Sequence, residues 1–153
     1  FVYCYKFQKI NVMRLIKLLT FSLLVTLVTL NIKASNGDNK STFDWTPLIT
    51  VISKLESGGN PKARNGQYIG ILQISPGLVN VCNNILKSKG SSDRFTLNDR
   101  YSKEKSIQMF TLFMERYNPT NCIDKAIRMW KGGTRYSIKA TQSYVNRVMR
   151  LLK

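Results

Sequence analysis

The sequence contains no histidine, and this absence excludes several classes of enzyme. Catalytic triads and dyads that use histidine as the base are impossible, and so are metal sites with histidine ligands. The only cysteines, at positions 4, 82 and 122, lack the close spacing of metal ligands. We therefore expect neither a metal site nor a cofactor.

Acidic residues are also scarce. The chain of 153 residues has 8 acidic and 24 basic side chains, which gives a formal net charge of +16. Such an excess favours a polyanionic partner, which could be nucleic acid, an anionic membrane or an acidic wall polymer. The basic residues are scattered and form no long run, so an ordinary solvated surface explains them equally well. No nucleic-acid recognition motif is present, and we expect no nucleic-acid partner.

The longest apolar run, at residues 18–30, is too short to cross a membrane comfortably, since a span needs about 20 residues. It follows a basic start at residues 13–17, and Ala34 offers a small residue for cleavage. This three-part pattern predicts a secretory signal peptide at residues 13–34, preceded by an upstream extension, residues 1–12, that need not be native. The protein would then be exported to the periplasm or cell envelope and touch the membrane only through this segment. An uncleaved anchor and a buried core helix are the alternatives.

Removal of the signal segment would leave two cysteines, Cys82 and Cys122. An even pair in an exported protein suggests a disulfide. Closing a loop of about 40 residues would stabilise the fold by roughly 4 kcal/mol in the chain-entropy model. The alternative is a pair of buried free thiols.

Helical signals dominate the rest of the chain. Residues 35–46 are polar and read as a linker, followed by a single domain over residues 47–153. Apolar residues recur there at helical spacing, and no internal repeat or heptad is visible. The sequence predicts a mainly α fold of about five helices with at most a small β-hairpin near residues 65–74. The expected helix starts are Thr46-Pro47, Ser75-Pro76, Ser102, Thr120 and Ser137.

Glu56, one of only three glutamates, stands at an unusual position. It follows an apolar stripe and lies in the last turn of the first predicted helix, at the margin of the core. Partial burial and the negative end of the helix dipole both favour a protonated carboxyl, which a general acid needs. Gly58-Gly59 leaves open space beside it for a polymer. The alternative is an ordinary surface glutamate that pairs with Lys54 or another base.

Two stretches around Glu56, KLESGGNPKA and GQYIGILQIS, resemble the first two motifs of the lysozyme-like lytic transglycosylases, the soluble-lytic-transglycosylase family. Those motifs are Glu-Ser at a helix end and Gly-x-x-Gln after a turn. The stretch AIRMWKGG is similar to the third motif, with Trp130 at the tyrosine place and Lys131 at the asparagine place. A later Tyr-Val segment matches Tyr144-Val145. The resemblance covers residues 47–150 and implies a lysozyme-like α+β fold.

The resemblance also implies an activity, namely cleavage of the β-1,4 bond between N-acetylmuramic acid and N-acetylglucosamine in peptidoglycan. Glu56 would protonate the leaving oxygen and then accept the proton of the muramyl 6-hydroxyl as that oxygen attacks C1. The product would be a 1,6-anhydromuramyl sugar. No second carboxylate is needed, because the N-acetyl group of the substrate can stabilise the oxocarbenium-like centre.

The same resemblance assigns roles near the first two motifs. Ser57 would position Glu56 by a hydrogen bond, or it is a simple polar residue at a helix end. Gly70 would permit a special backbone angle or the close approach of a sugar. Gln73 would hydrogen-bond the substrate, or it is a buried amide that braces the turn.

Three further residues belong to the third motif and the Tyr-Val segment. Trp130 would stack on a sugar face, unless it is a core aromatic. The Tyr144 hydroxyl would reach Glu56 or the sugar, unless the ring only packs in the core. Lys131 departs from the family's asparagine, and a cation beside Glu56 would oppose its role as an acid, unless the side chain points outward to the carboxylates of the wall.

Two other functions fit the sequence. A hydrolytic muramidase on the same fold would need a second carboxylate, for which Asp93 and Asp99 are candidates. A non-catalytic wall-binding assembly component would retain the fold without efficient chemistry. In every case we expect a monomer whose partner is the peptidoglycan glycan strand, and which could serve a secretion, conjugation or phage assembly.

Overall fold

The computed structural model describes residues 43–152. The predicted extension, the signal peptide and most of the predicted linker lie outside the described residues. The described part contains five α-helices, one 3₁₀ helix and one hairpin: α2 (Thr46–Ser57), β1 (Arg64–Asn65), β2 (Tyr68–Ile69), α3 (Pro76–Ser88), η1 (Leu97–Tyr101), α4 (Lys103–Tyr117), α5 (Ile123–Gly132) and α6 (Ile138–Leu152).

The predicted fold class, mainly helical with a small hairpin, is confirmed. Strands β1 and β2 pair antiparallel over two residues each. Three of the predicted helix caps form as expected: the Ser75, Ser102 and Ser137 hydroxyls accept hydrogen bonds from the backbone N–H three residues later.

The folded unit begins earlier than the sequence predicts. Trp45 is only 4% exposed, and its ring meets that of Phe110 edge-on with centroids 5.8 Å apart. Trp45 also takes the N-cap position of α2, so Thr46 is the first helical residue rather than the cap. The predicted linker therefore contributes its last residues to the core.

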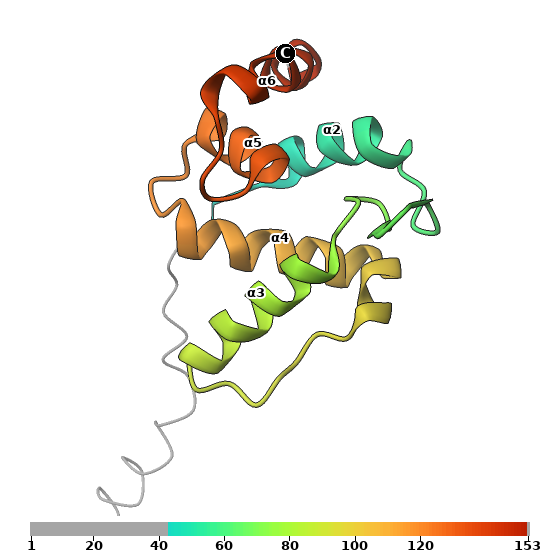
Figure 1. Cartoon of the computed structure of the whole chain (residues 1–153), viewed down its shortest axis with the longest axis vertical. Helices are drawn as coiled ribbons and strands as arrows, with labels where there is room; N and C mark the ends of the chain where they lie inside the picture. The colour runs from blue at the N-terminus through green and yellow to red at the C-terminus, as the bar shows by residue number, and fades with distance from the viewer. Residues whose placement is uncertain (1–42, 153) are drawn as a thin grey trace, which may run out of the picture. The chain divides into compact units, whose positions relative to one another are not determined.

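Helix α4 runs through the middle of this unit, with α3 on one side and α2, α5 and α6 on the other (Figure 1). Its buried side chains include Met109, Phe110 and Met114, none of which is exposed at all. Phe110 joins α4 to the helices on one of these sides, because it contacts Trp45 ahead of α2 and also Trp130 on α5 at 4.9 Å between ring centroids. Such central aromatic packing holds α2 and α5 at defined positions.

Helix α6 packs against both α2 and α5. A buried arginine of α5, Arg128, ties the two C-terminal helices together. Its guanidinium donates two hydrogen bonds to Asp124 on its own helix and others to Thr141 and Gln142 on α6. Arg128 is only 7% exposed, and leaving its charge without hydrogen bonds would be costly. Because some of its partners lie on α6, these bonds favour one arrangement of α5 and α6.

The predicted disulfide between Cys82 and Cys122 does not form, because both cysteines are free. Cys82 points into the core, where its thiol donates to the Met109 carbonyl at 3.5 Å and burial raises its pKa to about 12. Cys122 is exposed at the N-cap of α5. The two side chains thus have different environments that local sequence could not distinguish.

No helix within residues 43–152 combines the length and the apolar character needed to cross a membrane.

Candidate functional site

Glu56 lies where the sequence predicts, in the last turn of α2 and half-buried. The helix stops directly after it because Gly58 adopts a left-handed conformation with φ of 64°. The Glu56 carboxyl oxygen Oε1 accepts a hydrogen bond of 2.6 Å from the Tyr144 hydroxyl. The end of α2 and the middle of α6 thus meet at this carboxyl, although 88 residues separate the partners.

Tyr144 is only 5% exposed and reaches Glu56 from the core side. Burial, together with the hydrogen bond to Glu56, raises the pKa of its phenol. The hydroxyl therefore stays protonated at neutral pH and acts as a donor. The predicted reach toward Glu56 is confirmed, but Tyr144 does not line the adjacent pocket, so it is a positioning residue rather than a substrate-binding one.

A pocket of about 650 Å³ opens beside Glu56. Its size suits a small part of a polymer, such as one or two sugar rings. Residues from the hairpin and the turn after it, from α3, from the C-terminal half of α4 and from the end of α5 with its following loop line this pocket. The lining residues besides Glu56 are Asn65, Tyr68, Leu72, Gln73, Ile74, Ser75, Leu78, Val81, Phe113, Tyr117, Met129, Trp130, Lys131, Gly132, Gly133 and Thr134.

Gln73 lines the pocket and braces the turn at the same time. Its backbone has a positive φ of 51°, and its amide nitrogen Nε2 donates to the Gly70 carbonyl at 2.9 Å and the Ala63 carbonyl at 3.4 Å. Because two carbonyl partners require a donor there, the orientation of the amide is determined. Both predicted roles are therefore compatible, since Oε1 is left as an acceptor.

Ser57 and Gly70 were grouped with the substrate-binding residues, but neither lines the pocket, and for Gly70 the predicted special backbone angle is the alternative that forms. The Ser57 hydroxyl bonds to the Ile71 carbonyl at 2.8 Å, which ties the turn to the end of α2, and it does not bond to Glu56. Gly70 has a φ of +82° and faces the backbone carbonyl of Arg100, which leaves no room for a Cβ. Both residues act on the site indirectly, by holding the turn that carries Gln73.

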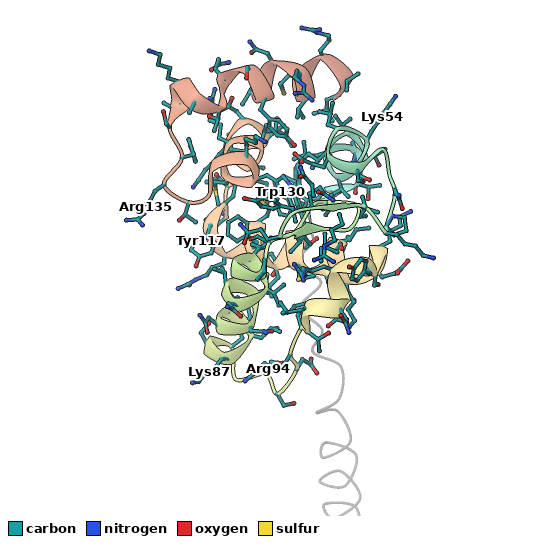
Figure 2. All side chains as sticks on the ribbon, turned by 45° about the vertical axis from the view of Figure 1, so that its right-hand side comes forward. Lys54, Lys87, Arg94, Tyr117, Trp130 and Arg135 are labelled. Carbon is teal, nitrogen blue, oxygen red and sulfur yellow. The ribbon has the colours of Figure 1, made fainter. Side chains whose placement is uncertain are left out.

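Trp130 combines the two alternatives left open for it. Its ring packs on Phe110 in the core, and it also lines the pocket. Figure 2 shows it near the centre of the unit, whereas Tyr117 and Arg135 extend toward one side. An anchored aromatic of this kind provides a stiff surface against which a sugar face can pack.

Lys131 lies beside the site but forms no ion pair with Glu56. Its ammonium nitrogen sits over the Tyr144 ring, 5.1 Å from the centroid. Among residues 43–152, the only ion pairs within 4.0 Å are Lys89–Glu115 and Arg128–Asp124. Lys131 and Glu56 thus line the same pocket and both contact Tyr144, without an ion pair between them.

Three residues of the site were not identified from the sequence. Tyr68 on β2 and Tyr117 at the end of α4 line the pocket and are 45% and 36% exposed. Tyr117 follows the apolar helical spacing of residues 107–117, which is typical of a core position, and Tyr68 precedes the Gly-x-x-Gln stretch by two residues. Buried Arg100 donates to the carbonyls of Gln67 and Ile74, at 3.0 and 3.3 Å, and so supports the hairpin from below. An aromatic residue in a glycine-rich turn, such as Tyr68, could have been predicted to contact a ligand. The burial of Arg100 could not have been predicted from the residues next to it in the sequence.

No protein-family model, curated protein or solved structure matches this chain. The interpretation of the site therefore depends on its own residues. Within the described part of the chain, no group of three or more His, Cys, Asp or Glu side chains could hold a metal ion. What the pocket offers instead is one carboxyl held by a phenol, one ammonium, two side-chain amides and four aromatic residues.

Replacing Tyr144 by phenylalanine tests whether the phenol positions the carboxyl. In the transglycosylase reaction proposed below, we expect the rate to fall about 10-fold, while the free energy of unfolding falls by only about 1 kcal/mol, the usual net value of one hydrogen bond. Rates and urea unfolding curves of the two proteins would measure both quantities. Tyr101→Phe is the matched control, since that ring is exposed outside the pocket, and equal rates for the Tyr144 variant and wild type would contradict the positioning role.

Proposed function

We propose that this protein is a peptidoglycan lytic transglycosylase in which Glu56 is the general acid and base. The observation that carries the proposal is the Glu56 carboxyl at the edge of the pocket, held from behind by the 2.6 Å hydrogen bond of Tyr144. This bond occupies one carboxyl oxygen and leaves the other for a glycosidic oxygen. A catalytic acid needs such a restrained position within reach of the atom that it protonates.

The chemistry follows from that position. Protonated Glu56 donates its proton to the oxygen that links the muramyl C1 to the next sugar, and the C1–O bond breaks. The muramyl 6-hydroxyl oxygen attacks C1, and its proton passes to the Glu56 carboxylate, which restores the acid. The N-acetyl group of the same sugar stabilises the positive charge at C1, and the product is a 1,6-anhydro ring.

The charges in the pocket favour a single-carboxylate mechanism. Glu56 is the only acidic side chain among the described residues that line it. An inverting hydrolase would place a second carboxylate about 6.5–9.5 Å away to activate water. Asp99 instead accepts a hydrogen bond from the Thr96 N–H as part of a helix cap, and Asp93 lines a different pocket beside α4.

Aromatic rings give the pocket a surface suited to sugars. Tyr68, Tyr117 and Trp130 stand on three different elements around it. The apolar faces of pyranose rings pack well against such rings, and hydroxyl groups can bond to their polar edges. Export to the periplasm or cell envelope would bring the protein to its glycan, where local opening of the wall could serve a secretion, conjugation or phage assembly.

Product masses test the proposal directly. Purified protein incubated with peptidoglycan is expected to release fragments that end in 1,6-anhydromuramic acid, each one water lighter than the hydrolytic product. Mass spectrometry of the soluble fragments would measure this. Reducing ends would instead support a hydrolytic muramidase, and binding without release of any fragment would support a non-catalytic wall-binding component.

A further inference from the structure

Lys131 is the only basic side chain among the described residues that line the pocket, just as Glu56 is the only acidic one. It stands in the last turn of α5, where the negative end of the helix dipole stabilises a cation. The pocket therefore offers a single positive group close to the proposed catalytic carboxyl. Any ligand that carries an anion near the reacting bond would meet this group.

The ammonium has no acidic partner among the described residues within 4.0 Å. Its neighbour is the Tyr144 ring, 5.1 Å from the nitrogen, which attracts a cation through the ring face but leaves its three N–H groups available. Gly132, the next residue, packs against Tyr136 and Thr141, but the surface is open one residue further along the chain. Gly133 lacks a side chain, and no atom lies within 4 Å of where a Cβ would be.

A purely structural role is the competing explanation. Lys131 could simply brace the Tyr144 ring, which an exposed cation–π contact would stabilise only slightly. Such a brace would change the stability of the protein and the placement of Tyr144. It would not make affinity depend on the charge of a ligand, and this difference separates the two explanations.

We propose that Lys131 recognises a carboxylate on the glycan, so that the site selects anionic muramyl sugars over neutral N-acetylglucosamine chains. This inference depends on the proposed function, because it assigns a substrate class to the same pocket. The muramyl sugar differs from N-acetylglucosamine by a lactyl group on O3. Its carboxylate is free in glycan without peptides, whereas in peptide-bearing glycan the stem peptides carry the carboxylates.

The position of Lys131 gives this recognition a consequence for catalysis. Lys131 on α5 and Glu56 on α2 both contact Tyr144, and both line the pocket. A carboxylate bound at Lys131 would therefore hold the muramyl sugar in the pocket that also contains the Glu56 carboxyl. Recognition of the muramyl sugar at Lys131 would then also determine which glycosidic bond the protein cleaves.

Binding measurements in a Glu56→Gln background, which prevents turnover, test the proposal. Three ligands are compared: a neutral N-acetylglucosamine oligomer, peptide-free muramyl glycan and peptide-bearing glycan of similar length. We expect the carboxylate ligands to bind about 5-fold more tightly than the neutral one, as is typical of a partly exposed ion pair. The preference should weaken at high salt.

Adding Lys131→Gln should abolish the preference, whereas Lys131→Arg should retain most of it. Lys87→Gln is the matched control, because it removes the same charge from a lysine that points outward at the far end of α3 (Figure 2). The control should leave the preference unchanged. A preference for only one of the two anionic ligands would identify the lactyl or the stem-peptide carboxylate as the group that is recognised.

The possible failures are distinct. A preference that survives Lys131→Gln, or one that Lys87→Gln also abolishes, would overturn the proposal and indicate attraction by the overall charge of the protein. Equal affinity of the Glu56→Gln protein for all three ligands would overturn it while leaving the proposed glycan substrate intact. Binding to none of them would overturn both proposals.

Discussion

Replacement of Glu56 by glutamine is expected to slow the release of peptidoglycan fragments by at least about 100-fold, which is the range of a lost general acid and base. Glutamine has the shape of glutamate and can still accept the Tyr144 hydrogen bond at 2.6 Å through its carbonyl oxygen. It cannot donate and recover a proton as a carboxyl does. The fold and the binding of glycan should therefore survive, and only the chemistry should be lost.

Clearing of a peptidoglycan suspension, followed by turbidity, would measure this effect. Glu115→Gln is the matched control, because Glu115 lies on α4 outside the pocket and pairs with Lys89 at its surface. It should clear the suspension at the wild-type rate. A Glu56→Gln protein as active as wild type would rule out catalysis by this carboxyl. If wild type and Glu56→Gln both bind peptidoglycan and neither clears the suspension, a wall-binding component would be favoured.

Replacement of Gly70 by alanine is expected to destabilise the protein by about 3 kcal/mol or more, the range of a severe local clash. The added Cβ would overlap the Arg100 carbonyl, and the φ of +82° is strained for any residue with a Cβ. The carbonyl cannot easily move aside. Arg100 is buried, its side chain is bonded to the hairpin, and its carbonyl accepts a hydrogen bond of 3.1 Å from Ser106.

Urea unfolding of the two proteins would measure this loss. Gly58→Ala provides the control, since Gly58 also has a positive φ, of 64°, but nothing lies within 4 Å of its added Cβ. That change should cost only about 1 kcal/mol, the price of the left-handed backbone alone. Similar losses for both variants would show that the contact with Arg100 is not rigid.

The helices could be predicted well where their signals are local. Ser75 and Ser102 form side-chain caps at the predicted positions. The start of α5 was predicted wrongly, at Thr120 instead of Cys122. The reason is Asn118, which is buried and bonds to both the N–H and the carbonyl of Cys122, so that the chain turns there before the helix can start.

The residues of the candidate site also differ in how well the sequence predicted their contacts. Glu56 was found from its motif and its position at the end of an apolar stripe, and the structure brings it to the pocket beside Gln73 and Trp130. Ser57 and Gly70 belong to the same motifs, but their contacts are with the backbone of the turn and with Arg100. A motif indicates which residues act together, but it does not show which of them faces the ligand.

The sequence by itself determined the helical class, most helix starts and the position of Glu56 in the last turn of the first helix, because periodicity, caps and short motifs depend on residues that are neighbours along the chain. Only the tertiary structure decided that Tyr144 holds Glu56 from behind, that Lys131 rests on the Tyr144 ring and that the two cysteines stay apart. These outcomes depend on how α2, α5 and α6 pack together. That packing is a sum of contacts between residues far apart in the chain, which no local pattern contains.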